Sequence, residues 1–599
     1  MAYDALEIYG QVSSPLVASL LTTHPNQVTL GGRVPDLWSS WWDWAAEHNQ
    51  HHPPKWTQLL EYYCRPLEKD ASIVDSPSTV HADLQLTSGQ IPPQLCRLID
   101  TVRDLQLSRE PICSLQGASL FHIHRRLTRI TPVDSKCPPC GAPRTRGRSP
   151  SSFGMSPKKE HEVSRMASFI RDLLSQDSRH RSAQHVVDVG SGQGYLSRAL
   201  KEQGLHVLAL DSDESQTSSA DKWRVKDSLR RAHEQRRAAF QNGCITAIRP
   251  PFPPAPTVSV ENGSLTHRTV HIQQQSLEVA IVEWLHSGAH DISSPFQEPI
   301  PIVFVALHAC GSLTVDILRT FLAQQDKTKN GSQRTWEPHS LVVVGCCYNL
   351  ISPSDFPLSK SLRALSPPPT LPIAALHLAT QVPAHWFRTE RSGKDAYLAV
   401  RKVVYRALLH PVLLLAARYR RSHEARDDSE NVRNGDGDET AVHLGLGETP
   451  GNRRLGKLNN TSYVNWATFL SCAVTKMDID LPILVRHHLE GEPDTEDLLP
   501  PWILYNGHDG GDREQRSTQE RLETESRLEV LHVLRCILGP LVETLILLDR
   551  YEWLRDELEA VEGESEVERK WKVDMINLFD QATGSGRNIA LVVRPAPGQ

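Results

Sequence analysis

One stretch constrains the fold of this chain more than any other: residues 185–200, with the sequence HVVDVGSGQGYLSRAL. The apolar run Val186 to Val189 is typical of a buried strand, and the residues from Tyr195 onward favour a helix. A turn containing three glycines separates them, and because glycine has no Cβ atom, the backbone can approach a ligand closely at these positions. A strand, a glycine-rich turn and a helix N-terminus bind nucleotide-like ligands. The stretch therefore predicts an α/β fold with a Rossmann-like sheet.

Two acidic residues narrow the choice of ligand. Asp188 ends the first strand, and a second apolar run, 206–210, ends in Asp211, 23 positions later. A carboxylate at the second strand suits the two hydroxyls of a ribose. A carboxylate ahead of the glycines disfavours pyrophosphate and suits the ammonium and sulfonium groups of S-adenosylmethionine, although a dinucleotide site or a chance turn stays an alternative. We therefore predict that S-adenosylmethionine is the cofactor, with its methionine end held by Asp188, Gly190, Gly192 and Gly194.

Two later apolar runs have polar residues at their ends. The run 302–307 leads into His308, and the run 341–344 leads into Tyr348 and Asn349. In an open parallel sheet the site lies at the carboxyl ends of the strands. We predict His308, Tyr348 and Asn349 as catalytic candidates, of which His308 has the most suitable unperturbed pKa. The predicted cofactor-binding residues are Asp188, Gly190, Ser191, Gly192, Gly194, Tyr195, Asp211, Leu307 and His308.

Three cysteines lie at the same two strand ends: Cys310, Cys346 and Cys347. With His308 they could form a metal cluster, but adjacent cysteines are poor joint ligands, so we predict no metal and interpret them as small packing residues. Cysteine-mediated methylation of cytosine C5 through Cys310 and Cys347 is a rival chemistry, but the Pro-Cys context that it requires is missing.

The remaining cysteines bear on the compartment. The chain has 11 cysteines without framework spacing and no recognisable signal peptide, which predicts an intracellular protein of the cytoplasm or nucleus. Cys137 and Cys140 could bind zinc with Cys113, His122 or His124, but their spacing matches no firm zinc pattern.

The most apolar later segment, 407–417, is too short to span a bilayer, so we expect a soluble protein without a membrane partner.

The predicted domain organisation follows from composition along the chain. The 41 prolines and the polar tracts indicate long loops between folded parts. Residues 575–580 and 588–594 read as two short strands that would close the sheet as an antiparallel hairpin. We predict an N-terminal helical domain at 1–130, a linker at 131–157, a catalytic core at 158–410 with an insertion at 241–275, a disordered insertion at 411–460, and C-terminal helices and closing strands at 461–599.

Four motifs, in order, carry a family resemblance: MSPKKEHEV from Met155, VDVGSGQGYLS from Val187, LHACG from Leu307 and GCCYN from Gly345. The combination resembles the methyltransferase-like protein 25 family, also described as ribosomal RNA adenine dimethylase domain-containing proteins. The resemblance implies a class I S-adenosylmethionine-dependent methyltransferase and, by analogy, an RNA acceptor. Ser312 stands where the family usually has Asp, and 584–586 read Gly-Ser-Gly where Ser-Pro is usual, so substrate contacts differ more than cofactor contacts.

The function predicted from the sequence is methyl transfer from S-adenosylmethionine to an acceptor that the sequence does not identify. The net charge of −6 gives no general attraction to nucleic acid. The stretch Lys222 to Arg237, however, carries seven basic and two acidic residues and could contact RNA, or it could be an ordinary solvated helix. The alternative function is a catalytically inactive, donor-binding scaffold or ribosome-associated module. The sequence does not predict the oligomeric state.

Overall fold

The computed structural model describes residues 4–29, 34–47, 53–65, 91–109, 155–175, 183–216, 263–287, 299–326, 335–431, 455–490, 499–504, 512–562, 571–581, 583 and 585–596. The chain divides into two compact units. The first consists of Met1–Gly10, Leu105–Thr380 and Pro540–Gln599, and the second of Gln11–Asp104 and Gln381–Gly539. Residues 131–154 of the predicted linker, the stretch Lys222 to Arg237 and the pair Cys137 and Cys140 lie outside the described residues.

A seven-stranded sheet, ordered β3-β2-β1-β4-β5-β7-β6, forms the centre of the first unit. Strands β1 to β5 pair in parallel, and β7 runs antiparallel to both β5 and β6. The strand order changes direction between β1 and β4, and ligands of open α/β sheets bind at such a switch point. This arrangement confirms the predicted Rossmann-like α/β class. The strands are β1 (His185–Val189), β2 (His206–Asp211), β3 (Leu265–Thr269), β4 (Ile300–Cys310), β5 (Trp336–Cys346), β6 (Trp571–Asn577) and β7 (Ile589–Pro595).

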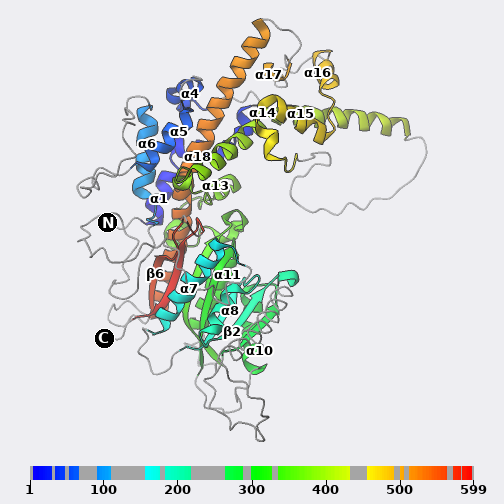
Figure 1. Ribbon diagram of the computed structural model, residues 1–599. Coiled ribbons are helices and arrows are strands. Elements are labelled where there is room, and N and C mark those ends of the chain that lie inside the picture. Colours follow the sequence, from blue (N-terminus) through cyan, green and yellow to red (C-terminus); the bar gives the residue numbers. More distant parts are fainter. Residues whose placement is uncertain are drawn as a thin grey trace, which may run out of the picture. The chain divides into compact units, whose positions relative to one another are not determined.

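Helices cover both faces of this sheet, as Figure 1 shows. On one face, Val187, Leu208 and Phe304 pack with α10 (Gln274–Ser287) and α11 (Leu313–Asp326). On the other, alternate residues such as Val186 and Val305 pack with α7 (Pro157–Ser175) and α8 (Tyr195–Glu202). A strand buried on both faces needs apolar side chains at consecutive positions, which explains the unbroken apolar runs of the central strands.

The C-terminal hairpin closes the sheet, as the sequence predicted. Leu341 to Val344 of β5 pair with Ala590 to Val593 of β7, and β6 pairs along the outer side of β7. The predicted strand 575–580 starts earlier than expected, at Trp571, because polar residues such as Lys572 and Asp574 are tolerated on an edge strand. The red C-terminal strand beside the green core in Figure 1 belongs to this hairpin.

The long helix α18 (Asp512–Glu562) contributes residues up to Gly539 to the second unit and residues from Pro540 onward to the first. Trp553, Leu554 and Leu558 of its C-terminal part belong to the same apolar core as α10 and α11. Among the described residues, α18 is long and apolar enough to cross a membrane by length and composition, but 94% of its apolar window is buried inside the protein. A helix buried to this extent packs in the interior of the protein.

The remaining elements of the first unit are η5 (Tyr348–Leu350), η6 (Pro353–Asp355), α12 (Lys360–Arg363) and α13 (Ile373–Leu378). Besides α18, two helices cross the division between the units, α1 (Ala5–Val12) and α6 (Pro93–Leu105). All regular elements among the described residues of the second unit are helices. It contains α2 (Pro15–Thr22), α3 (Pro25–Val28), η1 (Asp36–Trp38), α4 (Ser39–Ala46), α5 (Lys55–Cys64), η7 (Pro383–His385), α14 (Glu390–Asn431), η8 (Asn460–Tyr463), α15 (Trp466–Met477), α16 (Leu481–Glu490) and α17 (Pro501–Leu504).

Three of the predicted boundaries differ from the structure. Helix α14 continues through Pro411 to Asn431, and Leu408, Leu409 and Val412 around the proline are fully buried. Only 432–454 of the predicted disordered insertion therefore lies outside the described residues. The predicted insertion 241–275 contains β3, whose polar sequence is tolerated at the sheet edge. The predicted N-terminal domain 1–130 is divided, since residues 11–104 group with 381–539.

Candidate functional site

The glycine turn, residues 190–194, connects β1 to α8. Gly190 and Ser191 donate backbone hydrogen bonds of 2.9 Å to the carbonyl of Leu210, which fixes the turn against β2. Gly192 has a φ of +54°, and a Cβ added there would meet no protein atom within 4 Å. The space beside Gly192 is therefore open to a ligand, and a side chain at this position would occupy it.

Asp211 ends β2 directly beside the turn. One carboxylate oxygen accepts the backbone N–H of Gly192 at 2.7 Å, and the other accepts that of Asp213 at 2.9 Å. Each oxygen keeps a second lone pair, so the carboxylate can still accept a bond from a hydroxyl. These two bonds fix the orientation of the Asp211 carboxylate beside the glycine turn.

Asp188 is the last residue but one of β1 and is almost fully buried, with 1% of its surface exposed. The hydroxyl of Ser197 in α8 donates to its Oδ2 at 2.5 Å. Burial raises the pKa of Asp188 to about 6, and the negative charge of Asp211 acts in the same direction, while Ser197 and Lys159 oppose the shift. A buried carboxyl of this kind gains from a positively charged ligand group, because the pairing offsets the cost of ionisation.

His308 reaches the pocket because β4 contains a bulge. Ala306 pairs with Val343 and Ala309 with Gly345, so β4 has one residue more than β5 over this interval. A bulge of this type re-aims side chains at the edge of a site. The sequence placed the strand end at Leu307, but the strand continues to Cys310 and presents Leu307 and His308 from the bulge.

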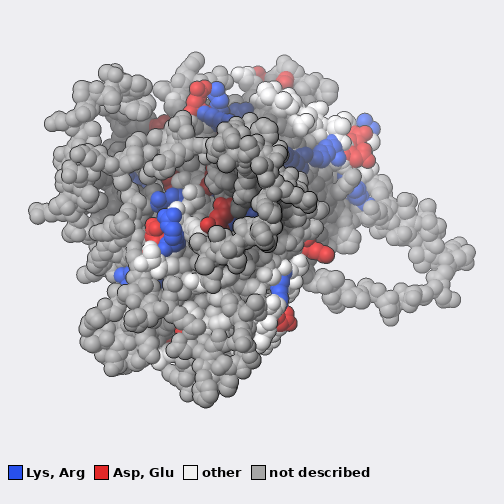
Figure 2. Space-filling model, turned by 60° about the horizontal axis from the view of Figure 1, so that its bottom comes forward, with Lys and Arg blue, Asp and Glu red and all other residues white. Residues whose placement is uncertain are grey.

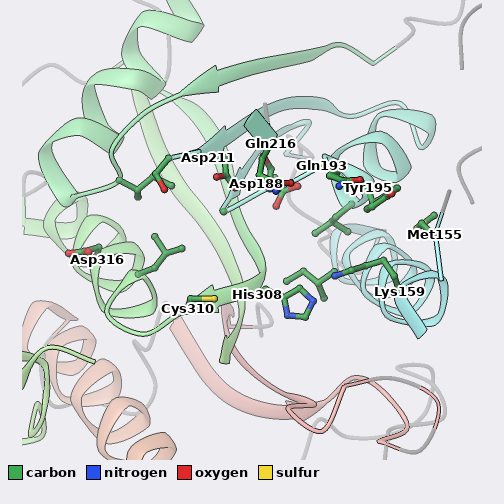
Figure 3. A pocket seen from close by; sticks show the side chains of 18 of the residues that line it. Met155, Lys159, Asp188, Gln193, Tyr195, Asp211, Gln216, His308, Cys310 and Asp316 are labelled. Carbon is green, nitrogen blue, oxygen red and sulfur yellow. Dashed lines mark hydrogen bonds between the residues drawn. The ribbon is translucent and has the colours of Figure 1, made fainter. Parts of the chain in front are cut away.

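Glu162 of α7 binds the imidazole of His308. The Oε2 atom of Glu162 lies 3.2 Å from Nε2 of His308 and 3.5 Å from Nζ of Lys159. Burial acts to raise the pKa of Glu162, but the hydrogen bond and charge of His308, together with Lys159 and Lys158, outweigh burial and lower it. Glu162 is therefore an ionised carboxylate that orients the histidine, and Figure 3 shows Lys159 extending toward the same ring.

The three cysteines at the ends of β4 and β5 form one group, the thiol cluster of Cys310, Cys346 and Cys347. The sulfur atoms of Cys310 and Cys346 lie 3.3 Å apart. A hydrogen bond from Cys346 lowers the pKa of Cys310 to about 6 against the effect of burial, and Cys347, His308 and Arg587 act in the same direction. The pKa values of Cys346 and Cys347 are raised, chiefly by the bond to Cys310 and by burial respectively.

Tyr348 lies below the site and not in the pocket lining. It is 1% exposed, its hydroxyl donates to Glu543 of α18 at 2.9 Å, and the Arg550 guanidinium lies 5.8 Å from its ring centroid. Burial raises the pKa of Tyr348 well above its ordinary value. Asn349, the other predicted catalytic residue, and Gly194 are also not among the residues that line the pocket. Tyr348 therefore anchors the end of β5 to α18.

The pocket itself has a volume of about 740 Å³. Figure 3 shows Asp188 and Asp211 on one side of it and His308, Lys159 and Cys310 on another. The structure thus brings together most of the predicted cofactor-binding residues, which also line the pocket: Asp188, Gly190, Ser191, Gly192, Tyr195, Asp211, Leu307 and His308. Sequence reasoning missed Glu162 and Ser197 as partners of the site, although Glu162 stands within the conspicuous run KKEHE.

Comparisons with known families and proteins agree with this geometry. Residues 158–354 match the family model described as "Methyltransferase domain". The chain is 35% identical over 86 residues to the human (Homo sapiens) protein described as "Probable methyltransferase-like protein 25". That similarity spans 14% of this chain and 14% of that protein.

The sheet order, the position of the pocket at the switch point and the matched residues 158–354 all lead to one assignment. The chain carries a methyltransferase domain of the Rossmann-like α/β type.

Proposed function

We propose that the protein is an S-adenosylmethionine-dependent methyltransferase of the methyltransferase-like protein 25 type. The observation that carries the proposal is the open space beside Gly192, next to the carboxylates of Asp188 and Asp211, which Ser197 and Gly192 hold by hydrogen bonds. When bound, S-adenosylmethionine supplies an electrophilic methyl group on a sulfonium centre. The residues present fit this donor, since the Ser191 hydroxyl is buried in the pocket wall without a hydrogen-bond partner among the described residues.

Each end of the donor has a matching group. Asp211 would accept bonds from the ribose hydroxyls, because its carboxylate is already held by Gly192 and Asp213. Asp188 would pair with the ammonium group, which favours the ionised form of this buried carboxyl. The backbone of the glycine turn would lie against the donor, where any side chain at Gly192 would exclude it.

His308 is proposed as the residue that receives a proton from the acceptor. Its Nε2 faces Glu162, so an ionised Glu162 favours the tautomer with the proton on Nε2 and leaves Nδ1 as a proton acceptor. Positioning a base of this kind contributes about 10²–10⁴-fold to a rate. The remaining rate enhancement comes from holding the acceptor atom in line with the methyl–sulfur bond of the donor, because methyl transfer requires this approach.

RNA is proposed as the acceptor class on the basis of the sequence resemblance and the basic stretch Lys222 to Arg237. Figure 2 shows Lys and Arg interspersed with Asp and Glu among the described residues of the face that it draws. An RNA contact would therefore depend on a local basic stretch and not on a broad positive field.

The test uses purified full-length protein, tritiated donor and fractionated cell extract. We expect label in a fraction that RNase removes and protease does not, and no label with His308→Ala. Label that only protease removes would exclude RNA as the acceptor. Donor binding without any S-adenosylhomocysteine formation in any fraction would favour the inactive scaffold.

A further inference from the structure

We propose that Cys310, Cys346 and Cys347 form a binding site for a soft divalent cation of the zinc class, open on one side to the pocket. The three sulfur atoms all lie within 4.8 Å of one another. The sequence argument against a metal was that adjacent cysteines are poor joint ligands, and the backbone of Cys347 removes that objection.

Adjacent residues of an extended strand point to opposite faces, so Cys346 and Cys347 would diverge if β5 continued. Instead β5 ends at Cys346, and Cys347 adopts a φ of +48°. This left-handed conformation is uncommon for a residue other than glycine and is found preferentially at functional sites. It turns the chain so that the Cys347 thiol joins the other two.

The spacing of the sulfur atoms suits a metal. A tetrahedral ion with metal–sulfur distances of about 2.3 Å requires sulfur atoms about 3.8 Å apart. The sulfur atoms of Cys310 and Cys346 are 3.3 Å apart, and all three sulfur atoms lie within 4.8 Å of one another. Both values are within about 1 Å of the distance that a tetrahedral site requires.

The backbone around the cluster is fixed, as a preformed site requires. Cys310 and Cys346 are register partners in neighbouring strands, and Gly311 donates a backbone bond of 2.9 Å to the Cys346 carbonyl. A Cβ at Gly311 would meet the Leu350 carbonyl oxygen at 2.4 Å, so this close approach depends on glycine. Tyr348, bonded to Glu543, holds the following turn in place.

The number of protein ligands indicates that the fourth coordination position of the metal is exchangeable. Structural zinc sites have four protein ligands, whereas catalytic sites have three and leave the fourth to water or substrate. The cluster supplies three thiols from the described residues, and Cys310 lines the pocket. Three thiolates and a divalent ion leave one negative charge, and the Arg587 guanidinium acts electrostatically on both Cys310 and Cys347.

The experiment must separate this cluster from Cys137 and Cys140. The full chain carrying Cys137→Ser and Cys140→Ser is therefore the reference, produced in zinc-supplemented medium and purified without chelator. Elemental analysis should find about one zinc ion per chain. Adding Cys347→Ser should remove the zinc, and adding Cys472→Ser, a half-buried cysteine of α15 outside the cluster, should leave it.

Thermal melts control for folding, and Cys347 is chosen because it is only half-buried. Three results would overturn the proposal. The first is a reference protein without zinc, and the second is zinc retained in the Cys347→Ser protein. The third is an intact protein mass that is two hydrogens lower than calculated, together with peptide mapping that finds a disulfide between Cys310 and Cys346. In the last case the cluster would be a dithiol pair and not a metal site.

Discussion

The carboxylate of Glu162 lies 3.2 Å from Nε2 of His308, which joins helix α7 to the bulged end of β4 across 146 positions of sequence. Glu162 is 1% exposed, and the pKa of its carboxyl is lowered, so the contact is a charge-assisted one in a buried place. The histidine ring is therefore held in one orientation at the pocket wall before any acceptor arrives.

Replacing this carboxylate should impair catalysis without affecting donor binding. Glu162→Gln keeps the shape but removes the charge that orients His308, so we expect kcat to fall about tenfold to a hundredfold while the donor Kd changes little. Single-turnover formation of S-adenosylhomocysteine and calorimetry measure the two quantities. Glu160→Gln on the same helix is the control, and an equal loss in both variants would exclude a specific role for Glu162.

Donor affinity should depend on pH through Asp188. Its pKa in the free protein is about 6, raised from 3.8, so the carboxyl is protonated below pH 6 and cannot pair with an ammonium. Affinity should be constant between about pH 6.5 and 7.5 and fall roughly tenfold per pH unit below 6. The charged neighbours that face Asp188, Asp211 and Lys159, are retained in the control Asp188→Asn. That variant should bind weakly with no such slope, and a slope that survives in it would assign the titration elsewhere.

Tyr348 should matter for stability and not for chemistry. Its buried hydroxyl bonds Glu543, which also pairs with Arg109 at 2.6 Å. Tyr348→Phe leaves that carboxylate short of one partner, so we expect a loss of about 1–3 kcal/mol in the free energy of unfolding. The kcat of the folded variant should stay within a factor of two or so of the wild type. A large fall in kcat with an unchanged melt would return Tyr348 to the catalytic candidates.

The C-terminal hairpin should be necessary for the methyltransferase domain. A chain that ends at residue 525 loses β6, β7 and the part of α18 that shares a core with α10 and α11. The pairing edge of β5, Leu341 to Val344, would then be exposed, and exposed edges aggregate. We expect aggregation or lost donor binding, whereas a chain ending at residue 596 should behave as the full protein. A soluble, donor-binding monomer made of residues 155–420 would contradict the interrupted domain.

Much of this fold could be predicted from local pattern. The glycine turn, the apolar runs at β1, β2, β4 and β5, and the closing hairpin all have sequence signals that short-range physics explains. Strand β3 gave no such signal, because Thr266, His267 and Arg268 are polar residues that only a sheet edge accommodates.

The parts of the site that escaped prediction depend on tertiary structure. The bulge that presents His308 exists only as a register shift against β5, and the partnership of Glu162 with His308 spans two distant elements. Tyr348 follows a strand end like a catalytic residue, but packing against α18 buries it. The left-handed backbone of Cys347, which gathers the thiol cluster, likewise has no sequence signature.

The most direct test of the account is calorimetric titration of S-adenosylmethionine into the full-length protein and two glycine variants. Gly192→Arg fills the open space beside the glycine turn, and Gly204→Arg is the matched control, since Gly204 also has a positive φ, +90°, and no protein atom near its Cβ position. Gly204 lies in the turn between α8 and β2, away from the pocket lining. We predict binding by the wild type and by Gly204→Arg, and none by folded Gly192→Arg. Unchanged affinity in Gly192→Arg would contradict the assignment of this turn as the donor site.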